Sequence, residues 1–250
     1  DGSLLLDLRY TGYGIRPGKY ELEGLPAFHG QGWETLSVIL RDPSSGVEVE
    51  LLYGVCEEDD LITRAARLTD RGGGDVRRCQ AMSLCLDLSR ADLDLITFDG
   101  GHVRERNLDR APLRPGVQGV GSVRGTSSHQ HNPFVVLCDR DANEDYGLCY
   151  GAMLLYSGNF QAAAEAGQFE SARLVMGINP YRFTWTLEPG AIFSAPEAAM
   201  ICSEAGLGEM SRRFHRAIRD RLVRDHLQGR RKPVLVNNWE ATYFDFDPEK

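Results

Sequence analysis

The sequence predicts a mainly β protein: an antiparallel two-sheet sandwich, followed by a linker helix and one opened βα unit. Apolar and polar residues alternate in short runs from Leu4 to about Cys202, as they do in half-buried strands. Clusters of Gly, Pro, Asp and Ser separate these runs at intervals typical of sandwiches. After Ser203 the apolar spacing changes to three and four residues, so helix is expected only towards the end.

The predicted strands follow one another with turn signals between them. The clearest alternating runs are 36–40, 47–53, 61–68 and 181–187. Reversals are expected at 42–46, 70–75 and 188–190, where Pro, Gly and Asp favour turns. The glycines at 72–74 are assigned to a hairpin turn, because no strand-to-helix transition follows that would make them a phosphate-binding loop.

The last fifty residues carry a helix and then a different kind of strand. An apolar stripe at helical spacing predicts an amphipathic linker helix within 206–230, formed by Leu207, Met210, Phe214, Ala217, Ile218 and Leu222. The run 233–239 is typical of a strand buried on both faces of a parallel sheet, and Asp247-Pro248-Glu249 is typical of a helix start. One parallel strand cannot form a sheet, so the rest of this second domain is expected beyond residue 250.

The domain boundaries expected from these patterns are 1–205 for the sandwich, 206–230 for the linker helix and 231–250 for the first βα unit. The chain begins at Asp1 without a methionine, so a signal peptide that preceded it stays an open possibility.

Composition excludes several classes of protein. With 250 residues, 42% of them hydrophobic and 26% charged, the chain can bury a full core without disulfides. Its formal charge of −8 would repel a phosphate backbone, so no nucleic-acid partner is expected. No apolar run approaches the length of a membrane span, so no membrane partner is expected either.

The six cysteines show no metal or disulfide spacing. Most lie in apolar runs, as Cys85 does, and are expected to be buried free thiols. These features favour a reducing compartment, the cytoplasm, and no cofactor is expected.

The densest polar constellation is the run from Ser127 to Pro133. On a strand, His129 and His131 would point to the same face, a spacing that suits metal ligands, yet no third ligand lies nearby in the sequence. The interpretations left open are a sugar- or interface-facing hydrogen-bonding loop that uses His129, Gln130, His131 and Asn132, a structurally satisfied turn, and a metal site.

A second candidate site follows the predicted parallel strand. Trp239 offers an apolar ring for the C–H face of a sugar, and Asn238 offers donors and acceptors for hydroxyl groups. Composition alone equally allows Trp239 and Tyr243 to be interdomain core.

Four ordered blocks of sequence resemble glycoside hydrolase family 36, the α-galactosidases of raffinose and melibiose metabolism. The blocks are 124–134 (RGTSSHQHNPF), 156–160 (YSGNF), 176–180 (MGINP) and 237–246 (NNWEATYFDF), and the likeness covers nearly the whole chain.

The resemblance implies an N-terminal β-supersandwich, a linker helix and a (β/α)8 catalytic barrel, with 231–250 as the barrel's first strand and the start of its helix. It also implies that the sandwich in residues 1–205 lacks its first strands. It implies that Trp239 lies in the galactose pocket, with Asn238 beside it in the same block, and that both catalytic aspartates lie beyond residue 250. The implied activity is release of terminal α-galactose by a retaining mechanism, in a homotetramer that binds α-galactoside oligosaccharides. Alone, the chain is expected to be inactive, since no two of its acids near the opened strand converge on one bond. The alternative is a carbohydrate-binding or assembly module without catalysis.

Overall fold

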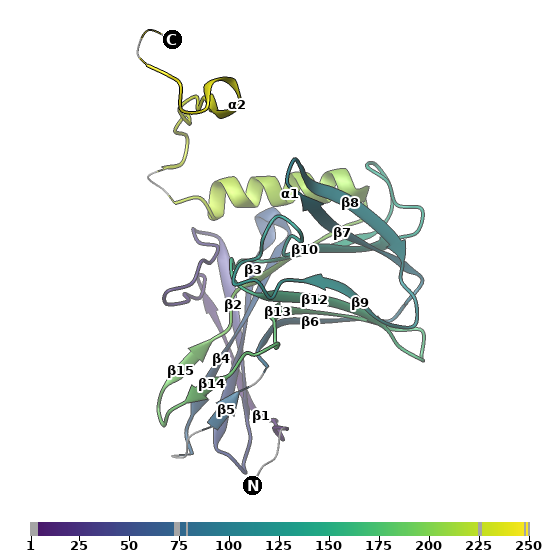
Figure 1. Cartoon of the computed structure of the whole chain (residues 1–250). Coiled ribbons are helices and arrows are strands. Elements are labelled where there is room, and N and C mark those ends of the chain that lie inside the picture. Colours follow the sequence, from purple (N-terminus) through teal and green to yellow (C-terminus); the bar gives the residue numbers. More distant parts are fainter. Residues whose placement is uncertain (1–4, 73–75, 79, 225–226, 248, 250) are drawn as a thin grey trace.

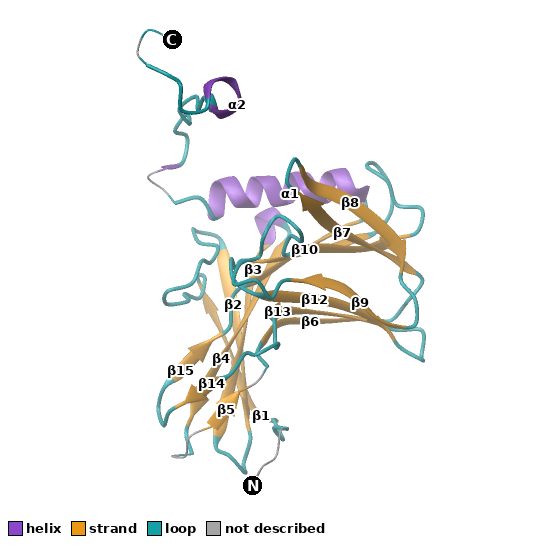
Figure 2. Ribbon diagram, viewed as in Figure 1, coloured by secondary structure: helices purple, strands orange, loops and turns teal. Residues whose placement is uncertain are grey.

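Strands make up most of the regular secondary structure in this computed structural model, which describes residues 5–72, 76–78, 80–224, 227–247 and 249 (Figure 2). The predicted mainly β fold is confirmed. The elements are β1 (Arg9–Pro17), β2 (Trp33–Arg41), β3 (Val47–Cys56), the 3-10 helix η1 (Glu57–Asp59), β4 (Leu61–Asp70), β5 (Val76–Arg78), β6 (Met82–Leu88), β7 (Leu93–Gly101), β8 (Arg104–Pro112), β9 (Gly116–Gly121), β10 (Phe134–Asp139), β11 (Cys149–Leu154), β12 (Phe160–Ala166), β13 (Ala172–Ile178), β14 (Trp185–Leu187), β15 (Ile192–Ser194), β16 (Ala198–Ser203), α1 (Gly206–Arg221) and α2 (Trp239–Thr242).

The strands form one large antiparallel sheet and two small ones (Figure 1). The ten-stranded sheet runs β1-β2-β3-β4-β16-β11-β10-β7-β8, with β15 added beside β4. The three-stranded sheet, β12-β13-β6, packs on part of the large sheet, and β14 pairs with β5. Strand β9 lies along β12, where Ser122 N donates to the carbonyl of Phe160 at 2.9 Å.

Strand β10 shows how the core is built. Val135 and Leu137 point into a cluster with side chains of β12 and β13, whereas Val136 and Cys138 point into a second cluster with α1. Because both faces of β10 are covered, the run from Phe134 to Cys138 is continuously apolar rather than alternating.

Helix α1 lies across the other face of the large sheet. Its buried Met210 and Phe214 pack over Gly151 of β11, where a Cβ would come within 2.6 Å of Met210 Sδ. Glycine at position 151 is therefore what lets the helix approach the sheet. The helix is 16 residues long and confirms the predicted amphipathic helix, although it is shorter than the segment 206–230.

Neighbouring loops hold both ends of α1. At its start, the backbone amides of Leu207 and Gly208 donate to the carbonyls of Asn143 and Glu144, at 2.9 Å each. At its end, Arg221 donates to Glu58 at 2.7 Å, to the carbonyl of Gln31 at 2.6 Å, and to Asp59. The contacts at the start supply acceptors for amide groups that a helix leaves unpaired there, and those at the end bind the Arg221 side chain to the neighbouring loop and η1.

Three local predictions differ from the structure. Only Trp185–Leu187 of the run 181–187 is a strand, because Asn179 Oδ1 accepts from Tyr181 N at 3.0 Å and Arg182 has a φ of 56°, which turn the chain. Residues 231–238 are not a strand, since no described strand lies beside them to supply backbone hydrogen bonds. Cys85 is exposed rather than buried, because it alternates outwards on β6. The 72–74 turn falls partly outside the described residues.

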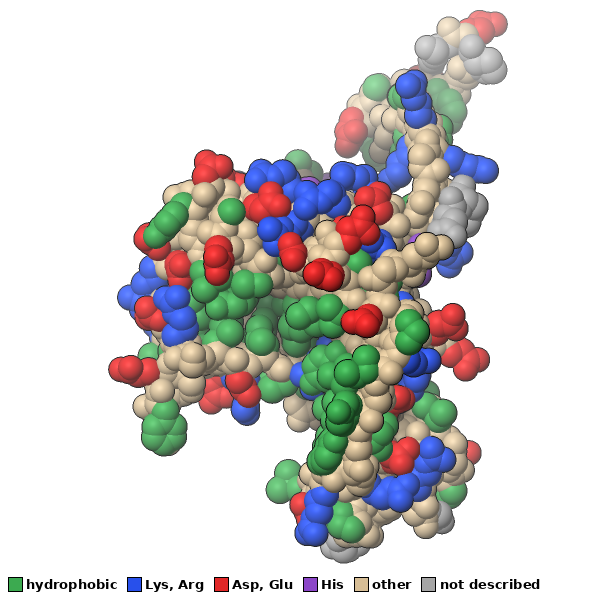
Figure 3. Space-filling model, turned by 180° about the vertical axis from the view of Figure 1, so that it is seen from behind, with side chains coloured by type: hydrophobic (Ala, Val, Ile, Leu, Met, Phe, Trp, Pro, Cys, Tyr) green, Lys and Arg blue, Asp and Glu red, His purple; other side chains and the backbone are tan. Residues whose placement is uncertain are grey.

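The face of the large sheet that carries β1 to β4 keeps many apolar side chains exposed. The three-stranded sheet is too small to cover the whole face of the ten-stranded sheet. Tyr13 and Ile15 of β1 are therefore each 66% exposed, and Val55 and Ile62 are each 41% exposed. A cavity of about 840 Å³ opens beside Val55 and Ile62. Seen from behind, apolar side chains gather into a band beside a hollow (Figure 3). We name the exposed apolar side chains of β1 to β4 the open sheet face.

No helix among the described residues is long and apolar enough to cross a membrane.

Candidate functional site

The loop between β9 and β10 contains the predicted polar constellation. Residues 128–130 form a turn in which Ser128 Oγ accepts from Gln130 N at 3.1 Å. The loop is then fastened to β7, where Gly100 N donates to the carbonyl of Gln130 at 3.0 Å and Asn132 N donates to the carbonyl of Phe98 at 3.1 Å.

The two histidines do not share a strand face as predicted. His129 lies in the turn and is exposed, whereas His131 is half-buried and pairs with Asp99 in an isolated bridge. Across from the loop, the backbone amides of Glu105 and Val103 lower the pKa of the Glu105 carboxyl, and His102 and His129 lower it further. In the described part of the chain no three His, Cys, Asp or Glu side chains lie close enough together to hold a metal ion.

Three of the four sequence blocks meet at the base of this loop. Gly125 N donates to Asn159 Oδ1 at 2.6 Å, and Ser127 N donates to the carbonyl of Ser157 at 2.8 Å. Asn179 Nδ2 in turn donates to the carbonyl of Phe160 at 3.0 Å. Many polar groups of these blocks therefore form hydrogen bonds that join the three chain segments.

Replacing Asn179 with alanine is expected to destabilise this junction. The variant loses the bond to the carbonyl of Phe160, which keeps only the bond from Ser122 N, and also loses the bond accepted from Tyr181 N. Urea unfolding should show a loss of about 1–3 kcal/mol in the free energy of unfolding. The matched control is Asn238→Ala, at an exposed position, which should change it by less than about 0.5 kcal/mol. Equal effects of the two substitutions would contradict the structural role of Asn179.

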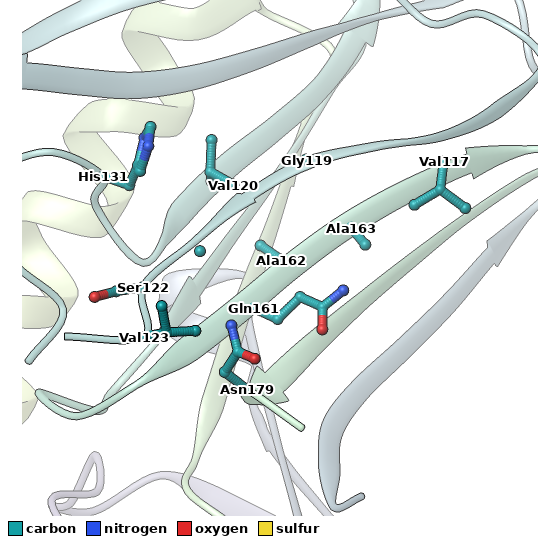
Figure 4. A pocket seen from close by; sticks show the side chains of 11 residues that line it. Val117, Gly119, Val120, Ser122, Val123, His131, Gln161, Ala162, Ala163 and Asn179 are labelled. Atoms are coloured by element: carbon teal, nitrogen blue, oxygen red, sulfur yellow. The ribbon is translucent and has the colours of Figure 1, made fainter. Parts of the chain in front are cut away.

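A cavity of about 490 Å³ lies between β9 and β12, beside His131 (Figure 4). Gly119 lets the two strands approach, since a Cβ there would come within 2.1 Å of the carbonyl oxygen of Ala162. Gln161 and Asn179 add amide groups to the lining, and no described lining residue is a carboxylate. The cavity can hold a polar molecule, but its described lining lacks the two carboxyl groups that retaining glycoside hydrolysis uses.

Sequence reasoning missed this cavity, although Asn179 belongs to one of the four blocks. The polar atoms His131 Nδ1 and Asn132 Oδ1 are buried beside it without a hydrogen-bond partner in the described structure. Buried polar groups usually have such partners, so these two atoms distinguish the loop from a fully satisfied turn.

The second candidate site, around Trp239, is an exposed aromatic cluster on α2. Asn237 Oδ1 accepts from Trp239 N at 3.0 Å, which helps to start this short helix. The Trp239 ring lies 4.8 Å from the ring of Phe244 and 5.4 Å from that of Tyr243, both edge-on, and Trp239 remains 45% exposed. Asn238 is also exposed. The cluster lies beyond α1, away from the 129–132 loop, so the two candidate sites are not brought together (Figure 1).

Comparison with known proteins decides the family. The sequence model of the glycosyl hydrolase family 36 N-terminal domain matches residues 1–188, and the melibiase model matches residues 192–250. The chain belongs to glycosyl hydrolase family 36. The predicted resemblance is thereby confirmed over both parts of the chain.

The similar proteins are α-galactosidases. The chain is 47% identical over 253 residues to alpha-galactosidase AgaA of Geobacillus stearothermophilus, which covers 100% of this chain and 35% of that protein. It is 44% identical over 242 residues to the bifunctional alpha-galactosidase/sucrose kinase of Mediterraneibacter gnavus, covering 96% of this chain and 26% of that protein. The chain thus spans about a third of the length of the first of these relatives.

Solved structures in the family have the same fold. The crystal structure of AgaA superimposes with a TM-score of 0.96 at 46% identity, covering 99% of this chain and 35% of the crystallised one. Crystal structures of AgaA variants hold stachyose and raffinose, and superimpose equally well.

Proposed function

We propose that residues 1–250 are the N-terminal part of a retaining α-galactosidase that releases terminal α-galactose from melibiose- and raffinose-type oligosaccharides. The observation that carries the proposal is the 47% identity to an α-galactosidase along the whole of this chain. The raffinose and stachyose complexes of AgaA variants support the class of substrate. The role proposed for these residues is scaffold, oligomer assembly and one wall of the sugar pocket, and the proposed location is the cytoplasm.

The wall of the pocket is assigned to Trp239 and Asn238. An exposed indole that is braced edge-on by Tyr243 and Phe244 is a rigid apolar platform for the C–H face of galactose. Asn238 immediately precedes it and offers an amide to sugar hydroxyls.

The catalytic carboxylates are assigned to residues outside 1–250. Retaining hydrolysis uses two carboxyl groups about 5–5.5 Å apart on either side of one bond. Near Trp239 the acidic side chains are Glu240, Asp245 and Asp247, and all three lie on one short exposed segment rather than on facing elements. The apolar side chains of Val234 and Leu235 are 92% and 91% exposed, which fits burial in a barrel completed by other residues.

Comparing two proteins tests the proposal. The full-length protein is expected to release galactose from melibiose and raffinose, whereas residues 1–250 alone should release none, because the described acids near Trp239 do not face one another across a bond. A folded full-length protein without this activity would overturn the proposal. Activity in residues 1–250 alone would contradict the assignment of the catalytic residues.

The proposed assembly is a homotetramer. The open sheet face supports self-association, because exposed apolar patches of this kind mark protein–protein contacts. Sedimentation of the full-length protein would measure the oligomeric state, and a monomer would contradict this part of the proposal.

A second candidate function is a carbohydrate-binding module without catalysis. The cavity of about 490 Å³, which His131 lines with a buried ring nitrogen that has no hydrogen-bond partner among the described residues, favours it. Calorimetry with raffinose separates the two candidates: binding by residues 1–250 that survives Trp239→Ala but not His131→Ala would favour the module.

A further inference from the structure

We propose that Cys138 and Cys149 form a reversible disulfide that fastens the loop holding the start of α1. The two residues are direct cross-strand partners in the antiparallel pair of β10 and β11, and both are free thiols in the structure. Their side chains are fully buried in the cluster between the large sheet and α1. Nothing in the proposed hydrolysis of galactosides uses these thiols.

The register of the hairpin places the pair in the arrangement that a disulfide needs. Asp139 N donates to the carbonyl of Leu148 at 2.9 Å, so Asp139 and Leu148 form the hydrogen-bonded pair. Cys138 and Cys149 are therefore the adjacent non-hydrogen-bonded pair, whose Cα atoms in antiparallel sheets lie ~4.5 Å apart. Disulfides span Cα separations of about 4.4–6.8 Å, so the bond can form without moving the strands apart.

The surroundings make the two thiols chemically unequal. The thiol of Cys149 donates to the carbonyl of Gly147 at 3.6 Å. The interaction between the two neighbouring thiols lowers the pKa of Cys138 and raises that of Cys149. The guanidinium of Arg110 lowers the pKa of Cys138 further, against the effect of burial. Arg110 is itself fixed by Asp94 at 2.7 Å and by the carbonyl of Ala142 at 2.6 Å. Cys138 is thus the nucleophile of the pair and Cys149 the thiol that completes the bond.

The oxidant proposed is a hydroperoxide, and the chemistry balances in two steps. The Cys138 thiolate attacks the peroxide oxygen of hydrogen peroxide, and a proton converts the departing hydroxide to water, which leaves a sulfenic acid on Cys138. The Cys149 sulfur then attacks the Cys138 sulfur and loses its proton, the S–S bond forms, and a second water leaves. A thiol reductant reverses the change by thiol–disulfide exchange.

The disulfide would act on the linker helix. The loop that joins the two cysteines is the one whose carbonyls, from Asn143 and Glu144, accept the first amide hydrogen bonds of α1. Closing the loop at its base restricts the motions that would break these bonds. Because only the Asp139–Leu148 pair separates the two cysteines from the loop, opening one end of the hairpin suffices to admit a small oxidant.

Peptide mapping of the full-length protein after mild hydrogen peroxide tests the proposal. A link between Cys138 and Cys149 is expected to exceed any link that involves the exposed Cys85 or Cys202 by about tenfold, and dithiothreitol should remove it. Oxidation of Cys85 or Cys202 while Cys138 and Cys149 stay reduced would overturn the proposal.

Single variants test the order of the steps and the effect on the helix. With Cys149→Ser, dimedone should trap a sulfenic acid on Cys138, while Cys138→Ser should give none on Cys149; the opposite pattern would overturn the assignment. The control is Cys56→Ser, which removes a buried thiol outside the pair and should leave the link intact. Oxidation should also slow hydrogen exchange at Leu207 and Gly208, and an unchanged exchange rate would refute the effect on α1.

Discussion

Replacing Glu197 with alanine is expected to destabilise the protein by about 3–5 kcal/mol, because it strands a buried ammonium group. Glu197 is fully buried and forms an ion pair with Lys19, whose side chain is only 5% exposed. The second carboxylate oxygen accepts from Phe28 N at 2.7 Å. The ion pair and this hydrogen bond therefore hold the long connection between β1 and β2 against the centre of the large sheet. The midpoint of urea unfolding measures the loss.

The loss in this variant should depend on pH in a defined direction. Burial lowers the pKa of Lys19, and the charge of Glu197 opposes this effect, so removing Glu197 lowers the Lys19 pKa further. At pH values between the lowered pKa of Lys19 in the folded state and its ordinary value near 10.5, the unfolded state binds more protons than the folded state. In this range the free energy of unfolding therefore rises with pH. The stability deficit of Glu197→Ala should accordingly shrink as the pH approaches 10.5.

A double variant separates the ion pair from packing. Changing Lys19 to methionine and Glu197 to leucine together removes both charges and keeps apolar volume. This variant should be more stable than either single one, because it leaves no unpaired charge whereas each single variant leaves one. A Glu197→Ala loss below about 1 kcal/mol, or a double variant no better than the single ones, would contradict this account.

Trp239→Ala in the full-length protein is expected to lower kcat/KM for melibiose by at least tenfold. Tenfold corresponds to about 1.4 kcal/mol of transition-state binding, a reasonable value for losing one stacked aromatic ring. The substitution removes the face that Tyr243 and Phe244 brace.

The chain offers a matched control for this variant. Trp185 on β14 is 47% exposed, against 45% for Trp239, and packs on Phe193 with ring centroids 5.3 Å apart. Trp185→Ala removes a similar ring far along the chain from the proposed pocket and should leave kcat/KM within about twofold of the original. An unchanged kcat/KM for Trp239→Ala would instead place Trp239 in an interdomain core.

Local sequence patterns predicted the helices and strands whose formation depends mainly on their own residues. Alternation located β2, β3 and β4, and the change of period located α1. The run 181–187 failed because the hydrogen bond accepted by Asn179 overrides alternation. The prediction of a strand at 233–239 was wrong, because a parallel strand depends on neighbours in the fold rather than on its own residues.

The contacts that join distant residues could not be predicted. Lys19 and Glu197 lie 178 positions apart, and neither has a local pattern that indicates an ion pair. The pairing of Cys138 with Cys149 requires the register of β10 on β11. The cavity beside His131 depends on glycines of β9 that allow close approach to β12. The assignments of Trp239 and Asn238 to the sugar pocket remain predictions.

The most direct measurement of the proposed function is the anomeric form of the first galactose that the full-length protein releases from melibiose, followed by proton NMR before mutarotation. A retaining α-galactosidase forms and hydrolyses a glycosyl-enzyme intermediate, so α-galactose should appear first together with glucose. Initial release of β-galactose would contradict the retaining mechanism. No cleavage of melibiose by the folded full-length protein would contradict the proposed function itself.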